Sequence, residues 1–215
     1  MAENRWFPLD VDDELDEIQA AFIDALKEGA ASWSLTPDDA EVLLPDHVAY
    51  GYRPQPGETS FGKLLVYADL LAPGLHLSLM TVGAYLDGAK IHGDRLHNHL
   101  LAFPAEPTPL AFTGSGPPAE LAAITADWFD AIWRRPVVRY DWLRSGQVYA
   151  HRFLFADTGQ GLIEGKVRTA ALGTPDRIVH VRGEPCMPEG GKALTAAGQV
   201  TVKAFSVPVA CPRRR

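Results

Sequence analysis

Hydrophobic residues recur at helical spacing in two stretches of the chain. In residues 12–30 the apolar positions are three or four residues apart, and acidic residues separate them: Leu15, Ile18, Phe22 and Leu26. In residues 117–134 a similar stripe is widened by further aromatic residues: Leu121, Ile124, Trp128, Phe129, Ile132 and Trp133. The spacing predicts two amphipathic helices over these ranges. A short third helix is predicted to begin at Thr36 as its cap, with Pro37 in its first turn, and to end at Pro45.

Strand patterns account for most of the remaining chain. Two apolar runs are hydrophobic on both faces, as in central strands covered on two sides, and the others alternate between apolar and polar positions. The predicted strands are residues 47–53, 64–71, 75–86, 90–103, 110–113, 162–167 and 177–182. Asp87-Gly88 predicts a turn into the strand that starts at Lys90.

Residues 136–156 predict a β-hairpin that follows the second helix directly. Ser145-Gly146 lies between two runs rich in β-branched and aromatic residues, which suits a two-residue turn. With that turn and an unbroken register, one face becomes an aromatic wall of Val138, Tyr140, Trp142, Tyr149, His151 and Phe153. The same register predicts an exposed ion pair between Asp141 and Arg152.

The order of these elements predicts an α+β fold. Strands come in consecutive runs, so we expect a mostly antiparallel sheet with the 12–30 and 117–134 helices packed on it. The 215 residues fit a single α+β domain over 1–183, followed by a Pro- and Gly-rich extension over 184–215. Alternation returns weakly at 199–207, which predicts at most one edge strand there.

Charge and cysteine content narrow the functional classes. The net charge of −7 argues against a nucleic-acid-binding protein, which usually carries a basic face. Residues 61–86 are the most apolar stretch, but Lys63, Asp69 and Pro73 interrupt it, so no membrane span is expected. The N-terminus is acidic rather than apolar, which favours a cytoplasmic protein. We expect Cys186 and Cys211 to be free thiols, although pairing between them stays open.

One cluster of histidines is a candidate metal site. On a strand, His97 and His99 would share one face, and two imidazoles on one strand can converge on a metal ion. Asp94 and Arg95 lie nearby in the sequence. A third ligand is not identified by spacing, and His76, His47 and Asp69 are candidates. The alternative is an exposed polar strand without a metal.

Other chemistry-bearing residues favour structural roles. Gly-x-Ser-x-Gly is absent, so a hydrolase nucleophile elbow is not indicated. Ser115 precedes the second helix and is predicted to cap it. His151 is expected to be a neutral core residue of the hairpin, and His180 a surface residue.

The apolar breadth of the second helix suggests a partner surface. Trp128, Phe129 and Trp133 supply more aromatic area than one stripe requires, and large aromatics often anchor interfaces. The sequence therefore predicts a non-catalytic interaction or scaffold protein of bacterial type, without a cofactor, that binds a protein partner or a second copy of itself. The alternative is a small-molecule enzyme, namely a metal-assisted hydrolase that holds a divalent transition metal through His97 and His99.

Overall fold

The computed structural model describes seven stretches of the chain: residues 6–9, 13–33, 39–44, 63–74, 77–97, 100–165 and 172–183. These stretches form two helices and two antiparallel sheets, which confirms the predicted α+β class. The chain divides into two compact units. The first contains Met1–Leu71 and Met80–Ile132, and the second contains Ala72–Leu79 and Trp133–Arg215. That residues 1–183 form a single domain stays a prediction.

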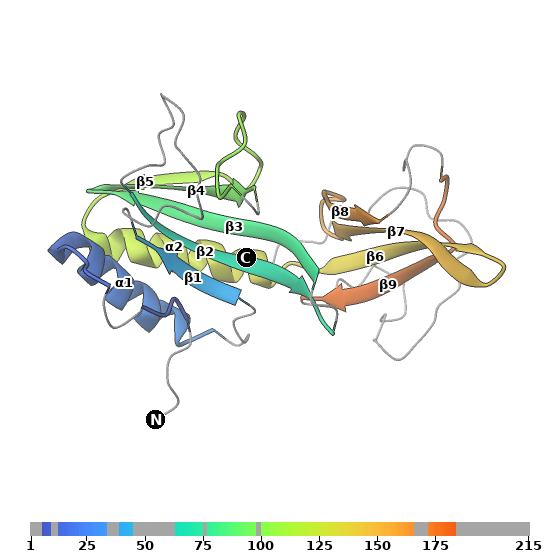
Figure 1. The fold of residues 1–215 in the computed structure, drawn as a ribbon, viewed down its shortest axis with the longest axis horizontal. Helices are drawn as coiled ribbons and strands as arrows, with labels where there is room; N and C mark the ends of the chain where they lie inside the picture. The colour runs from blue at the N-terminus through green and yellow to red at the C-terminus, as the bar shows by residue number, and fades with distance from the viewer. Residues whose placement is uncertain are drawn as a thin grey trace. The chain divides into compact units, whose positions relative to one another are not determined.

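The first unit contains a five-stranded meander (Figure 1). Its strands are β1 (Asp39–Leu43), β2 (Leu64–Ala72), β3 (Leu77–Asp87), β4 (Lys90–Leu96) and β5 (Phe112–Ser115). They lie in the sheet in the same order as in the sequence, so each pairs with its neighbour along the chain. The predicted turn joins β3 to β4: Gly88 has a φ of 56°, and Asp87 lies opposite Lys90.

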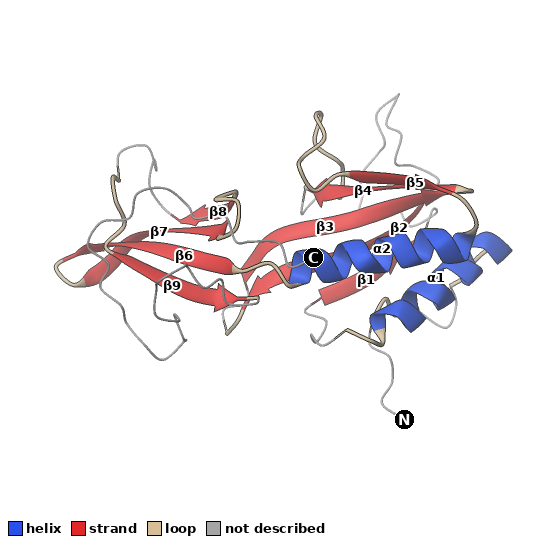
Figure 2. Ribbon diagram, turned by 180° about the vertical axis from the view of Figure 1, so that it is seen from behind, coloured by secondary structure: helices blue, strands red, loops and turns tan. Residues whose placement is uncertain are grey.

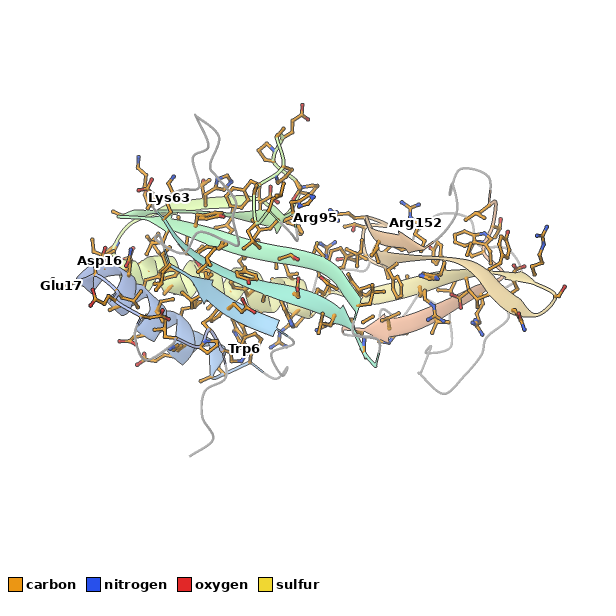
Figure 3. The ribbon with its side chains drawn as sticks, in the orientation of Figure 1. Trp6, Asp16, Glu17, Lys63, Arg95 and Arg152 are labelled. Atoms are coloured by element: carbon orange, nitrogen blue, oxygen red, sulfur yellow. The ribbon has the colours of Figure 1, made fainter. Side chains whose placement is uncertain are left out.

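The helix α1 (Glu17–Ala30) begins later than predicted because a capping box fixes its start. The Asp16 side chain accepts a hydrogen bond from the Gln19 backbone N–H at 2.8 Å, and the Gln19 side chain accepts one from the Asp16 N–H at 3.1 Å. Asp16 and Glu17 lie at this end of the helix in Figure 3. The buried side chains are Phe22, Ile23, Leu26 and Ala30. Ile18, which was predicted to lie on the buried stripe, is exposed. The buried face of the helix is therefore rotated from the predicted one.

The helix α2 (Pro118–Trp133) matches the predicted 117–134 helix closely. Its buried face includes Leu121, Ala122, Thr125, Ala126 and Phe129, whereas Ile124 is exposed. Both helices cover the same face of the five-stranded sheet (Figures 1 and 2). A Cβ added at Gly29 would lie only 2.9 Å from the Cβ of Ala126. The two helices therefore approach each other closely at a position where a side chain does not fit.

One predicted helix is wrong. Residues expected to continue the helix after Thr36 and Pro37 instead form β1, which pairs antiparallel with β2 and places Leu43 opposite Leu65. Leu65 is fully buried, so the pairing adds a strand to an apolar sheet. Long-range strand pairing of this kind overrides a local helix-start signal. Thr36, Pro37 and Pro45 themselves lie outside the described residues.

The second unit contains a four-stranded antiparallel sheet. Its strands are β6 (Val137–Arg144), β7 (Gln147–Phe155), β8 (Gly161–Gly165) and β9 (Arg177–Arg182), in the order β8-β7-β6-β9. The predicted hairpin is β6–β7, and its turn is Ser145-Gly146 as expected. Both turn residues have positive φ, 51° and 78° respectively, which is typical of a type I′ turn.

A β-bulge overturns the predicted aromatic wall. Leu143 lies opposite Val148, as the two-residue turn requires, but Trp142 lies opposite Ala150, so Tyr149 is an extra residue. An extra residue moves every later side chain to the opposite face. Tyr140 and Trp142 therefore share one face, and His151 and Phe153 share the other. Alternation alone does not reveal a bulge.

The bulge also moves Arg152, the predicted partner of Asp141, to the opposite face of the sheet. An exposed pair with Arg152 was predicted, whereas Asp141 is fully buried and forms ion pairs with Arg139 at 2.7 Å and Arg177 at 2.5 Å. Arg152 instead lies opposite Tyr140. The predicted exposed pair is thus replaced by a three-residue ionic cluster around the buried Asp141.

Several predictions fall on undescribed residues. The strand at 47–53, the extension 184–215 with its edge strand at 199–207, and both cysteines lie outside the described stretches. Within those stretches, neither helix has the length and apolar character needed to cross a membrane.

Candidate functional site

The structure places only half of the predicted metal pair. β4 ends at Leu96, so His97 lies beyond the strand and not within it, while His99 is outside the described residues. His97 is exposed, and its Nδ1 accepts a hydrogen bond from the Leu100 N–H at 3.3 Å. The strand expected over 90–103 ends before His97, whose carbonyl instead accepts a hydrogen bond from the Leu101 N–H at 2.7 Å, and the metal pair itself stays a prediction.

The other residues proposed for that site have structural partners. Asp94 is buried and accepts hydrogen bonds from the backbone N–H groups of Arg95 at 2.7 Å and Thr108 at 2.9 Å. Asp69 accepts a hydrogen bond from the hydroxyl of Thr81. Within the described stretches, no three His, Cys, Asp or Glu side chains gather in a way that could hold a metal ion. His47 and His76 lie outside those stretches.

The aromatic residues of α2 pack inside the protein. Phe129 and Trp133 are buried, and Trp128 is half-buried with its indole N–H donating to the Leu110 carbonyl at 2.8 Å. The Phe129 ring lies 5.4 Å from that of Phe7. These side chains therefore fill packing positions, and their use as a partner surface stays a prediction.

Three further predicted roles have mixed outcomes. Ser115 is the last residue of β5, three positions before α2 begins, so it does not cap the helix. His180 lies within β9 and is half-buried, not exposed. His151 is half-buried, and its ring meets the Phe153 ring edge to face at 5.5 Å. Hairpin packing therefore accounts for His151 better than catalysis does.

A groove of about 570 Å³ is hollowed at one end of the five-stranded sheet. Its walls include two rows of side chains that run across β3, β4 and β5. The first row is Asp87, Lys90 and Ser115, and the second row is Tyr85, His92 and Thr113. Residues directly opposite each other in a sheet share a face, so the register itself brings these groups together. The volume falls within the range of small-ligand sites.

An aromatic platform forms one side of this groove. The Phe103 ring lies 4.4 Å from the His92 ring and meets the Tyr85 ring edge to face at 5.3 Å. The Tyr85 hydroxyl donates to the Leu101 carbonyl at 2.6 Å. Leu101 and Phe103 also pack against the small apolar cluster of Leu65, Tyr85 and Leu96. The platform is therefore anchored on the sheet and not carried by an isolated loop.

The buried carboxylate of Asp94 fixes the same loop a second time. Besides the Thr108 N–H, it accepts a hydrogen bond from the Thr108 hydroxyl. Asp94 lies on β4 two residues after His92, so its side chain points to the same face of the sheet. A hydrogen-bonded buried carboxylate is expensive to displace. We infer a positioning role for Asp94: it holds the wall that faces His92.

Lysine side chains make the groove locally basic in a chain of net charge −7. Lys63 lies just before β2 (Figure 3), and its Nζ is 3.1 Å from an Asp87 carboxylate oxygen. Lys90 is exposed at the start of β4, and within the described stretches it has no ion-pair partner. The charged lining is thus two lysines against one aspartate, which favours an anionic group.

The groove presents an imidazole and two hydroxyl groups beside each other. A serine or threonine nucleophile needs a base within hydrogen-bond distance, and that base needs an orienting partner. Within the described stretches His92 contacts Phe103 but forms no hydrogen bond with a hydroxyl or a carboxylate. Its ring nitrogens are available to a ligand, and the hydroxyls of Thr113 and Ser115 are exposed beside it.

The ionic cluster of the second unit is not a comparable site. Asp141 is fully buried, and each of its two carboxylate oxygens is held by an arginine, Arg139 or Arg177. Its carboxylate is therefore saturated from within the sheet. A group with all its hydrogen-bonding capacity used contributes structure but no open position for a ligand.

Sequence reasoning missed the groove, although part of its signal was present. The predicted strand over 90–103 includes His92 and Asp94, and the predicted Asp87-Gly88 turn defines which residues of β3 and β4 are opposite. Thr113 and Phe103 come from a separate strand and a loop, and nothing local links them to His92. No protein-family model, curated protein or solved structure matches this chain.

Proposed function

We propose that this chain is a non-catalytic interaction protein whose groove receives an acidic and aromatic part of a partner protein. The observation that carries the proposal is that a positively charged surface and an aromatic surface lie on neighbouring rows of the groove. Lys90 supplies an exposed positive charge, and His92 with Phe103 supplies an anchored ring platform. Aromatic side chains that fill pockets often act as anchors in protein interfaces.

Electrostatics support an anion as the ligand. The chain as a whole is acidic, so an anionic partner is repelled at long range and gains only from a local basic site. Lys63 and Lys90 provide that site, while Asp87 partly neutralises it. Specificity then comes from the fit of charge and ring together, and we expect weak binding for either group alone.

The experiment uses a minimal ligand with both features. We expect 3-phenylpropionate to shift the backbone amide signals of His92, Thr113 and Ser115 in NMR titrations of the full chain. The neutral analogue 3-phenylpropanol should bind several-fold more weakly, because it lacks the carboxylate.

Charge reversal at the groove provides the matched variant. Lys90→Glu should weaken phenylpropionate binding about ten-fold or more, which is an ordinary effect for losing one charge-assisted contact. Arg144→Glu makes the same charge change at the exposed β6–β7 turn and should leave binding unchanged. Equal effects of the two variants, or shifts spread away from the groove, would contradict the proposal.

A further inference from the structure

The outer edge of β5 is open in the described part of the chain. β5 is the last strand of the sheet order, and β4 is its only neighbour among the described strands. Just beyond β5, the Gly116 N–H donates to the Ala89 carbonyl at 3.0 Å. Hydrogen-bonded positions alternate along an antiparallel strand, so Gly114 and Phe112 also direct their backbone groups towards β4.

The same alternation directs the backbone groups of Thr113 and Ser115 outwards. Their N–H and C=O groups face away from β4, where a further strand would lie about 4.8 Å away. Their side chains are exposed and line the groove. One short strand therefore offers both an open set of backbone hydrogen-bonding groups and one wall of the groove.

We propose, resting on the function proposed above, that the bound segment is an extended peptide that pairs antiparallel with β5. Peptides add to exposed sheet edges in this way: the backbone supplies affinity and alternate side chains supply specificity. Residues opposite Ser115 and Thr113 then point to the groove face. Ser115 shares its row with Lys90, and Thr113 shares its row with His92.

The register assigns a side chain to each row. The peptide residue opposite Ser115 is acidic and reaches Lys90, and the residue two positions later, opposite Thr113, is aromatic and stacks on the His92–Phe103 platform. Because the pairing is antiparallel, the order along the peptide is acid, any residue, aromatic. The ligand class is therefore an extended acid-x-aromatic segment.

A second copy of this chain fits the site less well. Edge-to-edge pairing of two β5 strands brings threonine and serine opposite each other, and neither residue offers a carboxylate to Lys90. The positive charge of Lys90 favours an acidic side chain on the bound segment. The occupant is thus a segment of another protein.

The test measures fluorescence polarisation of a labelled, end-blocked peptide with Glu-Thr-Phe at its centre, titrated with the full chain. N-methylation of the Glu or Phe nitrogen removes a donor that faces β5, so affinity should fall about ten-fold or more. N-methylation of the central Thr nitrogen removes a donor that points away and should leave affinity nearly unchanged. Lys90→Glu should weaken the parent peptide, and Arg144→Glu should not.

The outcomes separate this inference from the proposed function. If neither the peptide nor phenylpropionate binds, the proposed function itself fails. If the peptide binds and Lys90→Glu weakens it, but no N-methyl group does, the groove is correct and strand pairing is overturned. If only the central N-methyl group weakens binding, the antiparallel register is overturned. Sedimentation could instead show a concentration-dependent dimer that the peptide does not dissociate. That result would assign the β5 edge to a second copy of the chain and overturn the proposal that a peptide binds there.

Discussion

The two units of this protein hold their sheets together by different means. In the first unit, one sheet face and two helices bury an apolar core. Among the described residues of this unit, the buried polar side chains are Thr81, Asp94 and Thr125. In the second unit, ion pairs link the buried Asp141 and several partly exposed charged side chains. Asp141 pairs with Arg139 and Arg177, and Arg135 pairs with Asp157 at 2.9 Å.

The ionic pairs of the second unit are integrated with its aromatic packing. The Arg135 guanidinium lies 3.7 Å from the centre of the Phe155 ring as well as binding Asp157. The Trp142 indole N–H donates to the Gly173 carbonyl at 3.2 Å. Burying a charge is unfavourable unless it is fully paired, so this unit depends on complete clusters. The first unit depends on apolar area, which is lost gradually as side chains are shortened.

The largest expected effect is cavity formation in the first unit. Phe129→Ala removes a fully buried ring that contacts Phe7 and Trp33, and it should lower the free energy of unfolding by about 3–5 kcal/mol. Ile124→Ala on the same helix should change it by less than about 0.5 kcal/mol, because Ile124 is exposed. Chemical denaturation measures both values. Similar losses for the two variants would mean that the buried face of α2 is misassigned.

Asp141 provides the corresponding test in the second unit. Asp141→Ala leaves Arg139 and Arg177 without their carboxylate, and we expect a loss of about 2–3 kcal/mol, moderated because both arginines are partly exposed. Hydrogen exchange should show the loss of protection in β6, β7 and β9.

A triple variant separates the cost of an unpaired charge from the value of the ion pairs themselves. Combining Asp141→Leu with Arg139→Met and Arg177→Met removes all three charges and keeps apolar volume in their place. Because no buried charge is then left without a partner, this variant should regain most of the stability that Asp141→Ala loses. A triple variant no more stable than Asp141→Ala contradicts this account.

In both units, the elements that the sequence predicted well are those set by local signals. α2 and the β6–β7 turn were predicted closely, because periodicity and turn chemistry are local signals. β9 was predicted with its observed bounds, Arg177–Arg182. The start of α1 was missed because the Asp16–Gln19 capping box lies inside the apolar pattern and interrupts it.

Contacts between distant segments were not predictable from local pattern. β1 is defined by pairing with β2, and the Asp141 cluster depends on a strand more than thirty positions later. The groove likewise needs Phe103 and Thr113 beside His92. β1, the Asp141 cluster and the groove all depend on how the strands are aligned. A shift of one residue in the register changes which side chains meet.

Relieving backbone strain in the hairpin turn should raise the free energy of unfolding, by less than the losses above. Ser145 has a φ of 51°, which asparagine tolerates better than serine in a type I′ turn. Ser145→Asn should raise the free energy of unfolding by about 0.5–1 kcal/mol. Gly146→Ala should lower it by about 1–2 kcal/mol, since Gly146 has a φ of 78°. Denaturant midpoints of the two variants should move in opposite directions, and a common direction would count against the turn type.

The smallest expected effect is a dependence of stability on alkaline pH that originates in the second unit. Burial raises the pKa of Tyr140 above its ordinary value of 10.0, and the nearby Arg152 charge partly opposes that rise. As pH rises above 10.0, the Tyr140 hydroxyl ionises in the unfolded chain before it ionises in the folded chain. The contribution of Tyr140 to the free energy of unfolding is therefore complete below pH 10.0 and is lost as pH rises through the folded-state pKa. Tyr140→Phe should therefore reduce the fall in unfolding free energy between about pH 9 and about pH 11. Ultraviolet titration of the phenolate in the folded parent and in Tyr140→Phe identifies the late-titrating group. If the difference between the two titrations is centred at pH 10.0, Tyr140 ionises like an exposed tyrosine, and its packing against Trp142 does not exclude water as the structure indicates.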